Sequence, residues 1–356
     1  MPAFDIIVVG SGGGLDETNL SGYLLKPCDA SWEDGIVALE AGSGHGALRH
    51  IMKRNPTIFG ERPADEDPSK PQITPFTVYS NVKCFLLTHA HLDHINSLVM
   101  SAGTIGGGSK RIYGSPQTLK DLETIFSDRV WPRLATWDES NPLFRLVYHS
   151  VHADGKYKRI FPDISVRIME ISHGKNDSGL YESSAYFIRH DPTAHQFLFF
   201  GDVEPDSIAA KPKNIAIWRI AAPMIPQQLS VIFIECSYPA GRPNEVLWGH
   251  LCPEHLVQEM INLATEVVLA RKAPKTRAGG SRPRKKQRKN PVPPEELHGA
   301  LDGLRVYIMH CKEHFSSMDR PINHVIGDQA RDLLKPHHLG VELLTADQGM
   351  KIVWDQ

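Results

Sequence analysis

Four side chains able to bind a metal follow directly on a strand-length apolar segment, and this feature constrains the chain most. Residues 82–87 are the apolar segment, and His89, His91, Asp93 and His94 come after it. Imidazole and carboxylate groups that are buried together need partners, and holding four of them without a cation would be costly in free energy. This mixture of nitrogen and oxygen ligands suits zinc and neighbouring divalent ions. The segment therefore predicts a metal site at the end of a buried strand.

The spacing within the segment indicates two metal positions. His89 and His91 are two residues apart, so on extended backbone their side chains project to the same side. Asp93 and His94 fall after the turn and can face a second metal. The alternative is a polar loop with ordinary surface histidines, which suits a single histidine better than four ligands in one run.

The rest of the chain indicates two sheets with helices outside them. Strand-length apolar segments recur from residues 4–9 to residues 305–309, mostly separated by turns. Helical patterns are fewer, at residues 117–126 and from Pro253 toward residue 268. Strands and helices do not alternate regularly, which argues against a doubly wound parallel sheet. We therefore expect an α/β fold built mainly from sheet meanders.

The His-x-His-x-Asp-His motif of residues 89–94 resembles that of the metallo-β-lactamase superfamily. The resemblance implies a four-layer αββα sandwich, in which two mixed sheets lie between outer helices. It also implies that His89, His91 and a later histidine bind one metal ion. Asp93, His94 and a last histidine would bind a second ion, and a further aspartate would bridge the two.

Three residues at the ends of apolar segments follow in the order that the superfamily requires. They are His173, Asp202 in the sequence Phe-Phe-Gly-Asp, and His310. Taken alone, each of them fits a structural or solvated side chain as well as a ligand, and their joint order favours the ligand role. The sequence departs from the superfamily pattern at Glu40, where an aspartate is usual after the third strand. The supporting role of that position therefore stays open.

A separate segment carries a candidate proton donor. His250 lies in Trp-Gly-His-Leu-Cys-Pro-Glu-His-Leu, just before a helix start, and Glu235 follows an apolar strand and could orient it. Two divalent ions about 3.5–4 Å apart can deprotonate a bridging water and hold the attacking and leaving oxygens of a displacement at phosphorus. A positioned acid near the leaving oxygen adds about 10²–10⁴-fold in rate. The catalytic residues we expect are His250, Asp93 and Glu235.

The same features resemble the class II cyclic-nucleotide phosphodiesterases within the superfamily. The resemblance rests on the acidic strand end followed by Gly-His, on Leu92, on the Ile-Asn-Ser-Leu-Val sequence after His94, and on Gly-His-Leu-x-Pro-x-His-Leu. It implies hydrolysis of 3′,5′-cAMP to 5′-AMP by a metal-bridging hydroxide, with cGMP as a second substrate. It further implies a small-molecule substrate and two divalent metal ions, for which we expect zinc.

Two other functions stay open. An RNA-processing phosphodiesterase related to the tRNA 3′-endonucleases would share the fold and the candidate donor. A non-catalytic, metal-containing protein would dock on an acidic partner through its basic segment. Three smaller features are expected to have structural roles. His45 is interpreted as a turn residue and His255 as a surface or capping residue. The glycine-rich residues 10–14 are interpreted as a hairpin turn and not as a dinucleotide-binding loop.

The chain as a whole is expected to be a single domain, residues 1–356, interrupted by a disordered basic insertion at about residues 271–294. Within the insertion, residues 282–289 could be a nuclear import signal or a solvated loop. The net charge of −2 gives no general attraction to nucleic acid or membrane, so we expect neither as a partner. Five scattered cysteines and an N-terminus unlike a signal peptide favour the cytoplasm, and a homodimer is compatible with all of this.

Overall fold

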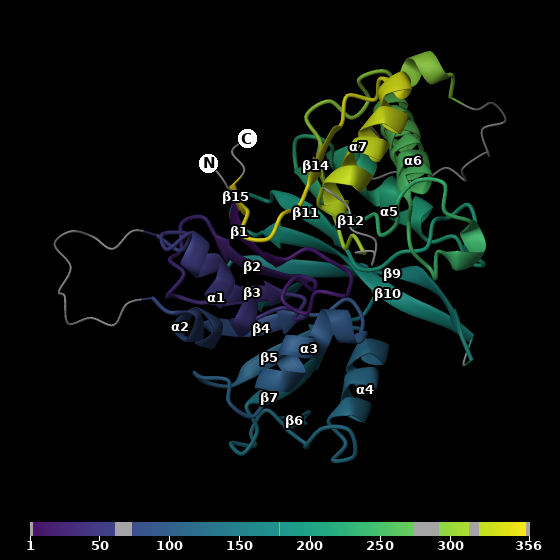
Figure 1. Cartoon of the computed structure of the whole chain (residues 1–356). Helices are drawn as coiled ribbons and strands as arrows, with labels where there is room; N and C mark the ends of the chain where they lie inside the picture. Colours follow the sequence, from purple (N-terminus) through teal and green to yellow (C-terminus); the bar gives the residue numbers. More distant parts are fainter. Residues whose placement is uncertain (1–2, 61–72, 178, 274–291, 313–319, 354–356) are drawn as a thin grey trace, which may run out of the picture.

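Two mixed β-sheets pack face to face and form the centre of the molecule (Figure 1). The computed structural model describes residues 3–60, 73–177, 179–273, 292–312 and 320–353. In spatial order, the strands of the eight-stranded sheet are β15 (Lys351–Val353), β1 (Phe4–Gly10), β2 (Gly22–Pro27), β3 (Ile36–Leu39), β4 (Val82–Leu86), β5 (Lys110–Gly114), β7 (Leu146–Ser150) and β6 (Ala135–Thr136).

The second sheet has seven strands and contains the longest ones. In spatial order they are β14 (Glu342–Thr345), β13 (Arg305–Met309), β12 (Leu229–Glu235), β11 (Gln196–Phe200), β10 (Gly179–His190), β9 (Ile164–Asn176) and β8 (Lys158–Phe161). The pairs β8–β9, β9–β10 and β10–β11 are antiparallel, whereas the pairs β11–β12, β12–β13 and β13–β14 are parallel. In the first sheet, β3, β4, β5 and β7 are likewise parallel. Parallel strands end at a common edge, and both sheets therefore bring several strand ends together.

Helices cover the outer face of each sheet (Figure 1). The first sheet carries α1 (His45–Arg54), α2 (Pro75–Ser80), α3 (Leu92–Ser101) and α4 (Pro116–Ile125). The second carries α5 (Asn214–Ala221), α6 (Pro253–Lys272) and α7 (Ile322–Leu334). Short 3₁₀ turns are η1 (Ala222–Met224), η2 (Asn244–Val246), η3 (Pro294–Leu297) and η4 (Lys335–His337). The predicted four-layer αββα sandwich of two mixed sheets is confirmed.

Three apolar layers hold these four layers of elements together. One lies between α1–α4 and the first sheet, one between the two sheets, and one between the second sheet and α5–α7. The layer between the sheets is rich in aromatic rings: Tyr23 packs edge-on against Phe199 and Phe233, at centroid distances of 5.3 and 5.9 Å. Burial on this scale is the main source of the fold's stability. No helix in the described part of the chain combines the length and apolarity needed to cross a bilayer.

Several predicted elements change when they are seen in three dimensions. β13 has the predicted bounds, whereas the segment predicted at residues 82–87 forms β4, which ends one residue earlier. β9 and β10 form a long paired ribbon. Helix α3 begins at Leu92, directly inside the ligand run, where a turn was expected. α6 extends through Lys272, and η3 begins at Pro294, so both ends of the expected insertion belong to regular elements. Its middle, residues 274–291 with the 282–289 run, lies outside the described residues.

Candidate metal centre and active site

The seven predicted metal ligands come together at the edge where the parallel strands of both sheets end. His89 follows β4, Asp202 follows β11 and His310 follows β13, while His173 lies within β9. His91 occupies the N-cap position of α3, so Asp93 and His94 fall in the first turn of that helix. Ligands in open sheets gather at the carboxyl ends of parallel strands, and this site follows the same rule on two facing sheets.

Four of the side chains form a first ligand group. His89, His91, His173 and Asp202 each offer one atom, and these atoms lie within 4.8 Å of one another. The Oδ2 atom of Asp202 is 3.5 Å from Nε2 of His89 and 3.6 Å from Nε2 of His173. Nδ1 of His91 is 3.3 Å from Nε2 of His173. Three imidazoles and a carboxylate oxygen are a ligand set that suits zinc.

The second ligand group uses the other oxygen of the same aspartate. Asp93, His94, Asp202 and His310 again place one atom each within 4.8 Å of the others. Oδ1 of Asp202 lies 3.2 Å from Nε2 of His94 and 3.3 Å from Nε2 of His310. Oδ2 of Asp93 lies 3.1 Å from Nε2 of His310. Asp202 thus faces one group with each carboxylate oxygen, which is the geometry of a bridging ligand.

The electrostatics of the site fit bound cations. Nε2 of His89 is buried and has no hydrogen-bond partner among the described residues. Burial, with the charge of His94 next, lowers the pKa of His89 well below its usual value, and burial lowers the pKa of His173 to about 4. Burial by itself would raise the pKa of Asp202, but the charges of His310 and His94 outweigh it and hold the pKa far below normal. Neutral His89 and His173 beside an ionised Asp202 have the protonation states that metal binding requires. His94 differs: although burial opposes it, the carboxylates of Asp202, Asp93 and Glu40 raise its pKa well above normal, and a bound cation would take the place of that proton.

Hydrogen bonds from behind orient the ligands of the first group. Nδ1 of His89 is 3.0 Å from Oγ1 of Thr88 and 3.3 Å from Oγ of Ser183. Nδ1 of His173 bonds the carbonyl oxygen of Gly249 at 2.9 Å. Such contacts on the far ring nitrogen set the tautomer that presents the other nitrogen to a metal.

The second group is supported from behind by an ion-pair contact to His94 and a hydrogen bond to His310. Oε2 of Glu40 lies 3.4 Å from Nδ1 of His94, and its Oε1 accepts the backbone N–H of Thr88 at 3.1 Å. Oγ of Ser237 is 3.0 Å from Nδ1 of His310. The open question about Glu40 therefore has a structural answer: its longer side chain reaches a ligand imidazole from behind.

A bulge in β9 aims His173 at the site. Between the pairs Glu182–Ser172 and Leu180–Lys175, β9 has one residue more than β10, and Gly174 there has φ of +74°. A glycine in the left-handed region is the usual way to build such a bulge. The predicted strand end at His173 is therefore wrong: β9 continues, and the bulge turns this imidazole toward the cluster.

His250 and Glu235 form a buried pair beside the second group. Nδ1 of His250 is 2.9 Å from Oε1 of Glu235, and no side chain in the described residues bonds its Nε2. Glu235 also accepts hydrogen bonds from Ser237 Oγ at 2.6 Å and from the backbone N–H of Val203 at 2.7 Å. Burial raises the pKa of Glu235 to about 7 and lowers that of His250 to about 4. Both carboxylate oxygens of Glu235 face only hydrogen-bond donors. We therefore place the proton that the pair shares on His250, whose Nδ1–H donates to an ionised Glu235.

Sequence reasoning missed several side chains at the site. Tyr181 stacks on His91 at a centroid distance of 4.7 Å and 3° between ring planes. Lys312 places its Nζ 3.7 Å from Oδ2 of Asp93, and Gly13 packs so closely that a Cβ there would lie 2.6 Å from the His310 ring. The position of Lys312, two residues after His310, was the only available signal; the others are distant in sequence.

The remaining sequence candidates lie outside the ligand groups. His45 is the exposed first residue of α1, and Nδ1 of His255 contacts Sγ of Cys252 at 3.0 Å in the first turn of α6. Gly10 is the last residue of β1, and residues 11–14 lie in the connection to the antiparallel strand β2, which confirms the hairpin interpretation.

A cleft of about 410 Å³ opens beside the first ligand group. His91 and His173 form part of its wall, together with Tyr181 and Trp248. Its size suits a small organic ligand. Two of the candidate metal ligands and two aromatic rings thus share the wall of this cleft.

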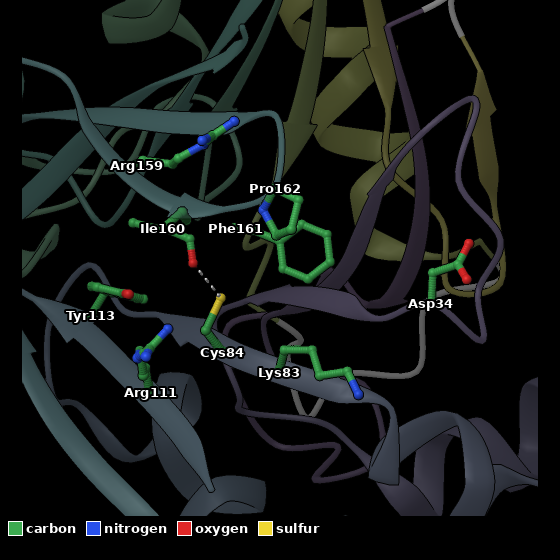
Figure 2. A pocket seen from close by; sticks show the side chains of 9 residues that line it. All are labelled: Asp34, Lys83, Cys84, Arg111, Tyr113, Arg159, Ile160, Phe161 and Pro162. Carbon is green, nitrogen blue, oxygen red and sulfur yellow. Dashed lines mark hydrogen bonds between the residues drawn. The ribbon is translucent and has the colours of Figure 1, made fainter. Parts of the chain in front are cut away.

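A larger cleft, of about 560 Å³, lies near the start of β4, away from the ligand groups (Figure 2). Lys83, Arg111 and Arg159 line it. Arg111 pairs with Glu139 at 2.6 Å and Arg159 with Asp163 at 3.3 Å, so much of its positive charge is already matched. None of the predicted site residues reaches it, and we therefore place the chemistry at the smaller cleft.

The chain is similar to known proteins in both sequence and structure. A family model described as class-II cAMP phosphodiesterases matches residues 57–349. The 3′,5′-cyclic-nucleotide phosphodiesterase of Schizosaccharomyces pombe is 31% identical over 280 residues, covering 74% of this chain and 76% of that relative. The crystal structure of unliganded yeast PDE1 is similar with a TM-score of 0.79 at 22% identity, covering 99% of this chain and 100% of that one. The metallo-β-lactamase fold protein YhfI from Bacillus subtilis is similar with a TM-score of 0.56 at 13% identity, covering 99% and 100%.

Proposed function

The chain belongs to the class-II cAMP phosphodiesterases, and from that premise we propose how its clustered side chains carry out the reaction. The enzyme hydrolyses the cyclic phosphodiester of 3′,5′-cAMP. We propose that the bond to the 3′ oxygen breaks, so that the product is 5′-AMP. The observation that carries the proposal is Asp202, whose two oxygens each face a separate group of ligands.

We propose that the two groups hold two divalent ions, and that these are zinc. Nitrogen-rich ligands with a shared carboxylate favour zinc over magnesium or calcium. When bound, such ions lower the pKa of the attacking water and neutralise charge on the phosphate. Asp93 would serve both as a ligand and as an acceptor that orients this water. The seven protein ligands are proposed to be His89, His91, Asp93, His94, His173, Asp202 and His310.

His250 is proposed as the proton donor. Its Nδ1 bonds Glu235, which leaves Nε2 as the nitrogen that can reach substrate. As the bond from phosphorus to the 3′ oxygen breaks, that oxygen gains negative charge and needs a proton. Glu235 would stabilise the protonated imidazole before the transfer, because its carboxylate is ionised and buried beside the ring.

The cleft beside the first group would hold the rest of the nucleotide. It is adjacent to His91 and His173, so a substrate bound there would have its phosphate at the metals and its base toward Trp248. Stacking on an aromatic ring does not read the polar edge of a base, so adenine and guanine can both be accepted. We therefore propose cGMP as a second substrate.

Product analysis tests this function. Metal-loaded protein is incubated with 3′,5′-cAMP, and the products are separated by chromatography against 5′-AMP and 3′-AMP standards. We expect 5′-AMP alone, and no turnover above background with His91→Ala. Release of 3′-AMP, or equal turnover by the variant, would contradict the proposal. Metal analysis of both proteins should show about two ions in the wild type and fewer in the variant.

The two alternative functions are not supported by a specific observation. An RNA-processing enzyme should lose RNA affinity steeply as the salt concentration rises. An RNA affinity that does not change with salt would therefore exclude this function. A non-catalytic docking protein does not agree with membership of an enzyme family. The homodimer, the cytoplasmic location and nuclear entry through residues 282–289 remain predictions.

A further inference from the structure

Trp248 is an exposed aromatic residue on the rim of the cleft beside the metal ligands. It is 69% exposed and lines the cleft together with His91 and His173. Within the described part of the chain its indole has neither a ring partner nor a hydrogen bond. A large apolar ring left in solvent at a ligand cleft indicates a contact that forms only when a ligand binds.

The backbone holds Trp248 in a costly conformation. Its φ is +55°, in the left-handed region that bulky side chains rarely adopt. The next residue, Gly249, has φ of +81°, and its carbonyl oxygen bonds Nδ1 of His173 at 2.9 Å. A tryptophan that strains the backbone and buries little of itself adds no stability that we can identify. Strain of this kind tends to persist at sites of function.

The neighbours of Trp248 fix where its indole stands relative to the reaction. Gly249 packs against β9 so closely that a Cβ there would lie 2.8 Å from the carbonyl carbon of His173. His250, the proposed donor, follows at once. A single residue, Gly249, packed against β9, therefore separates the exposed aromatic face of Trp248 from the proposed donor His250.

We propose that Trp248 is the stacking platform for the nucleobase and a determinant of base selectivity. This inference rests on the proposed function, since it assigns a residue to the same cleft. An indole offers the largest aromatic face among side chains, and it favours purines over pyrimidines because a two-ring base overlaps it more fully. Stacking does not read the polar edge of the base, so the platform alone does not separate cAMP from cGMP.

Steady-state kinetics with two classes of base test the platform. For Trp248→Gly we expect KM for cAMP to rise about tenfold or more, with kcat changed less than threefold, since a stacked base is lost but the reacting atoms stay in place. KM for a pyrimidine substrate, 3′,5′-cCMP, should rise clearly less. Trp248→Phe should recover most of the affinity for cAMP. The matched control is Trp137→Ala, which removes another exposed indole, 47% exposed and packed beside Tyr148.

The glycine variant also separates a binding role from a structural one. Glycine adopts φ of +55° without strain, and this gain offsets the larger backbone entropy of glycine in the unfolded chain, so the melting temperature of Trp248→Gly should stay close to that of the wild type. A lower melting temperature together with reduced kcat for both substrates would show a structural role and overturn the proposal. Unchanged KM for cAMP would overturn it as well, and would point instead to a surface contact with another protein.

A spectroscopic readout is independent of turnover. Binding of 5′-AMP should quench tryptophan fluorescence in the wild type, and this quenching should disappear in Trp248→Phe but persist in Trp137→Ala. Quenching that survives in Trp248→Phe would contradict stacking on this residue. If the wild type itself did not hydrolyse cAMP, the proposed function would fail and not merely the platform, so the two failures are distinguishable.

Discussion

At the scale of single residues, the site depends on carboxylates that are buried yet ionised. Asp202 is 2% exposed and Glu235 is fully buried, but each faces imidazoles or hydrogen-bond donors. A buried charge is tolerated only where such partners are present. These residues therefore organise the histidines around them, and their substitution should affect chemistry more than folding.

Glu235→Gln provides the prediction at this scale. The amide keeps the shape of the side chain but cannot stabilise a protonated His250, so kcat for cAMP should fall by roughly 10- to 100-fold with little change in KM. Steady-state kinetics measure both parameters, and metal analysis should still find the wild-type content. Glu254→Gln in α6 is the matched control. A loss of metal in Glu235→Gln would show that Glu235 supports the ligands and not the donor.

At the scale of elements, the positions of two glycines decide whether β9 and the loop before α6 can meet. Gly174 forms the bulge that turns His173 inward, and Gly249 packs directly against that bulge. The sequence suggested neither role, because the glycines are far apart along the chain and their contact depends on the folded ribbon. Their function is to bring a ligand and the proposed donor within one small volume.

Gly249→Ala tests this contact against a control with the same backbone. Its φ is +81° and an added Cβ would meet the backbone at His173, whereas Gly241 has φ of +80° and open space around it. In both alanine variants the left-handed backbone conformation lowers the free energy of unfolding by about 1 kcal/mol. Only Gly249→Ala should also lose metal from the first group and most activity. Metal analysis and denaturant unfolding compare the two, and equal metal content would disprove the role of the contact.

At the scale of the whole molecule, the candidate metal centre draws its side chains from both sheets. His89 comes from the first sheet, and His173, Asp202 and His310 come from the second. The central apolar layer packs these sheets together, and metal binding would add a second connection at one edge. Ions that bind only the folded state raise its stability by mass action.

Metal removal should therefore lower thermal stability as well as activity. At free zinc about 100-fold above the dissociation constant, one site contributes about 2.7 kcal/mol. We expect chelation to lower the melting temperature, and added zinc to restore it, in differential scanning calorimetry. Asp202→Ala should respond least to chelation, because both sites lose a ligand. An unchanged melting temperature of the wild type after verified metal removal would contradict a stabilising connection between the two sheets through bound metal.

The single-domain organisation is also tested at this scale. Lys272 at the end of α6 pairs with Glu296 in η3, so the two ends of the basic insertion lie side by side. Replacing residues 274–291 by a short Gly-Ser linker should leave kcat and KM unchanged, because loop length costs little free energy. Unfolding should remain one cooperative transition. Two transitions, or lost activity, would contradict a single domain with a dispensable insertion.

The amino-acid sequence alone predicts the fold class, six candidate metal ligands at strand or helix ends, and the candidate pair His250 and Glu235. These follow from local patterns: an apolar segment predicts a buried strand, and a polar residue after it marks the edge where the strand ends. The family resemblance carried over the order of His173, Asp202 and His310. Such signals are readable because each depends on residues adjacent along the chain.

How those residues divide between two groups follows from the folded arrangement and not from the sequence pattern. Which oxygen of Asp202 faces which histidines, and why Glu40 can replace an aspartate, depend on distances between strands of facing sheets. The helix beginning at Leu92, the bulge at Gly174 and the exposed ring of Trp248 likewise arise from packing between distant segments. Local sequence cannot encode them, because the free energy that selects each one comes from contacts that form only in the folded chain.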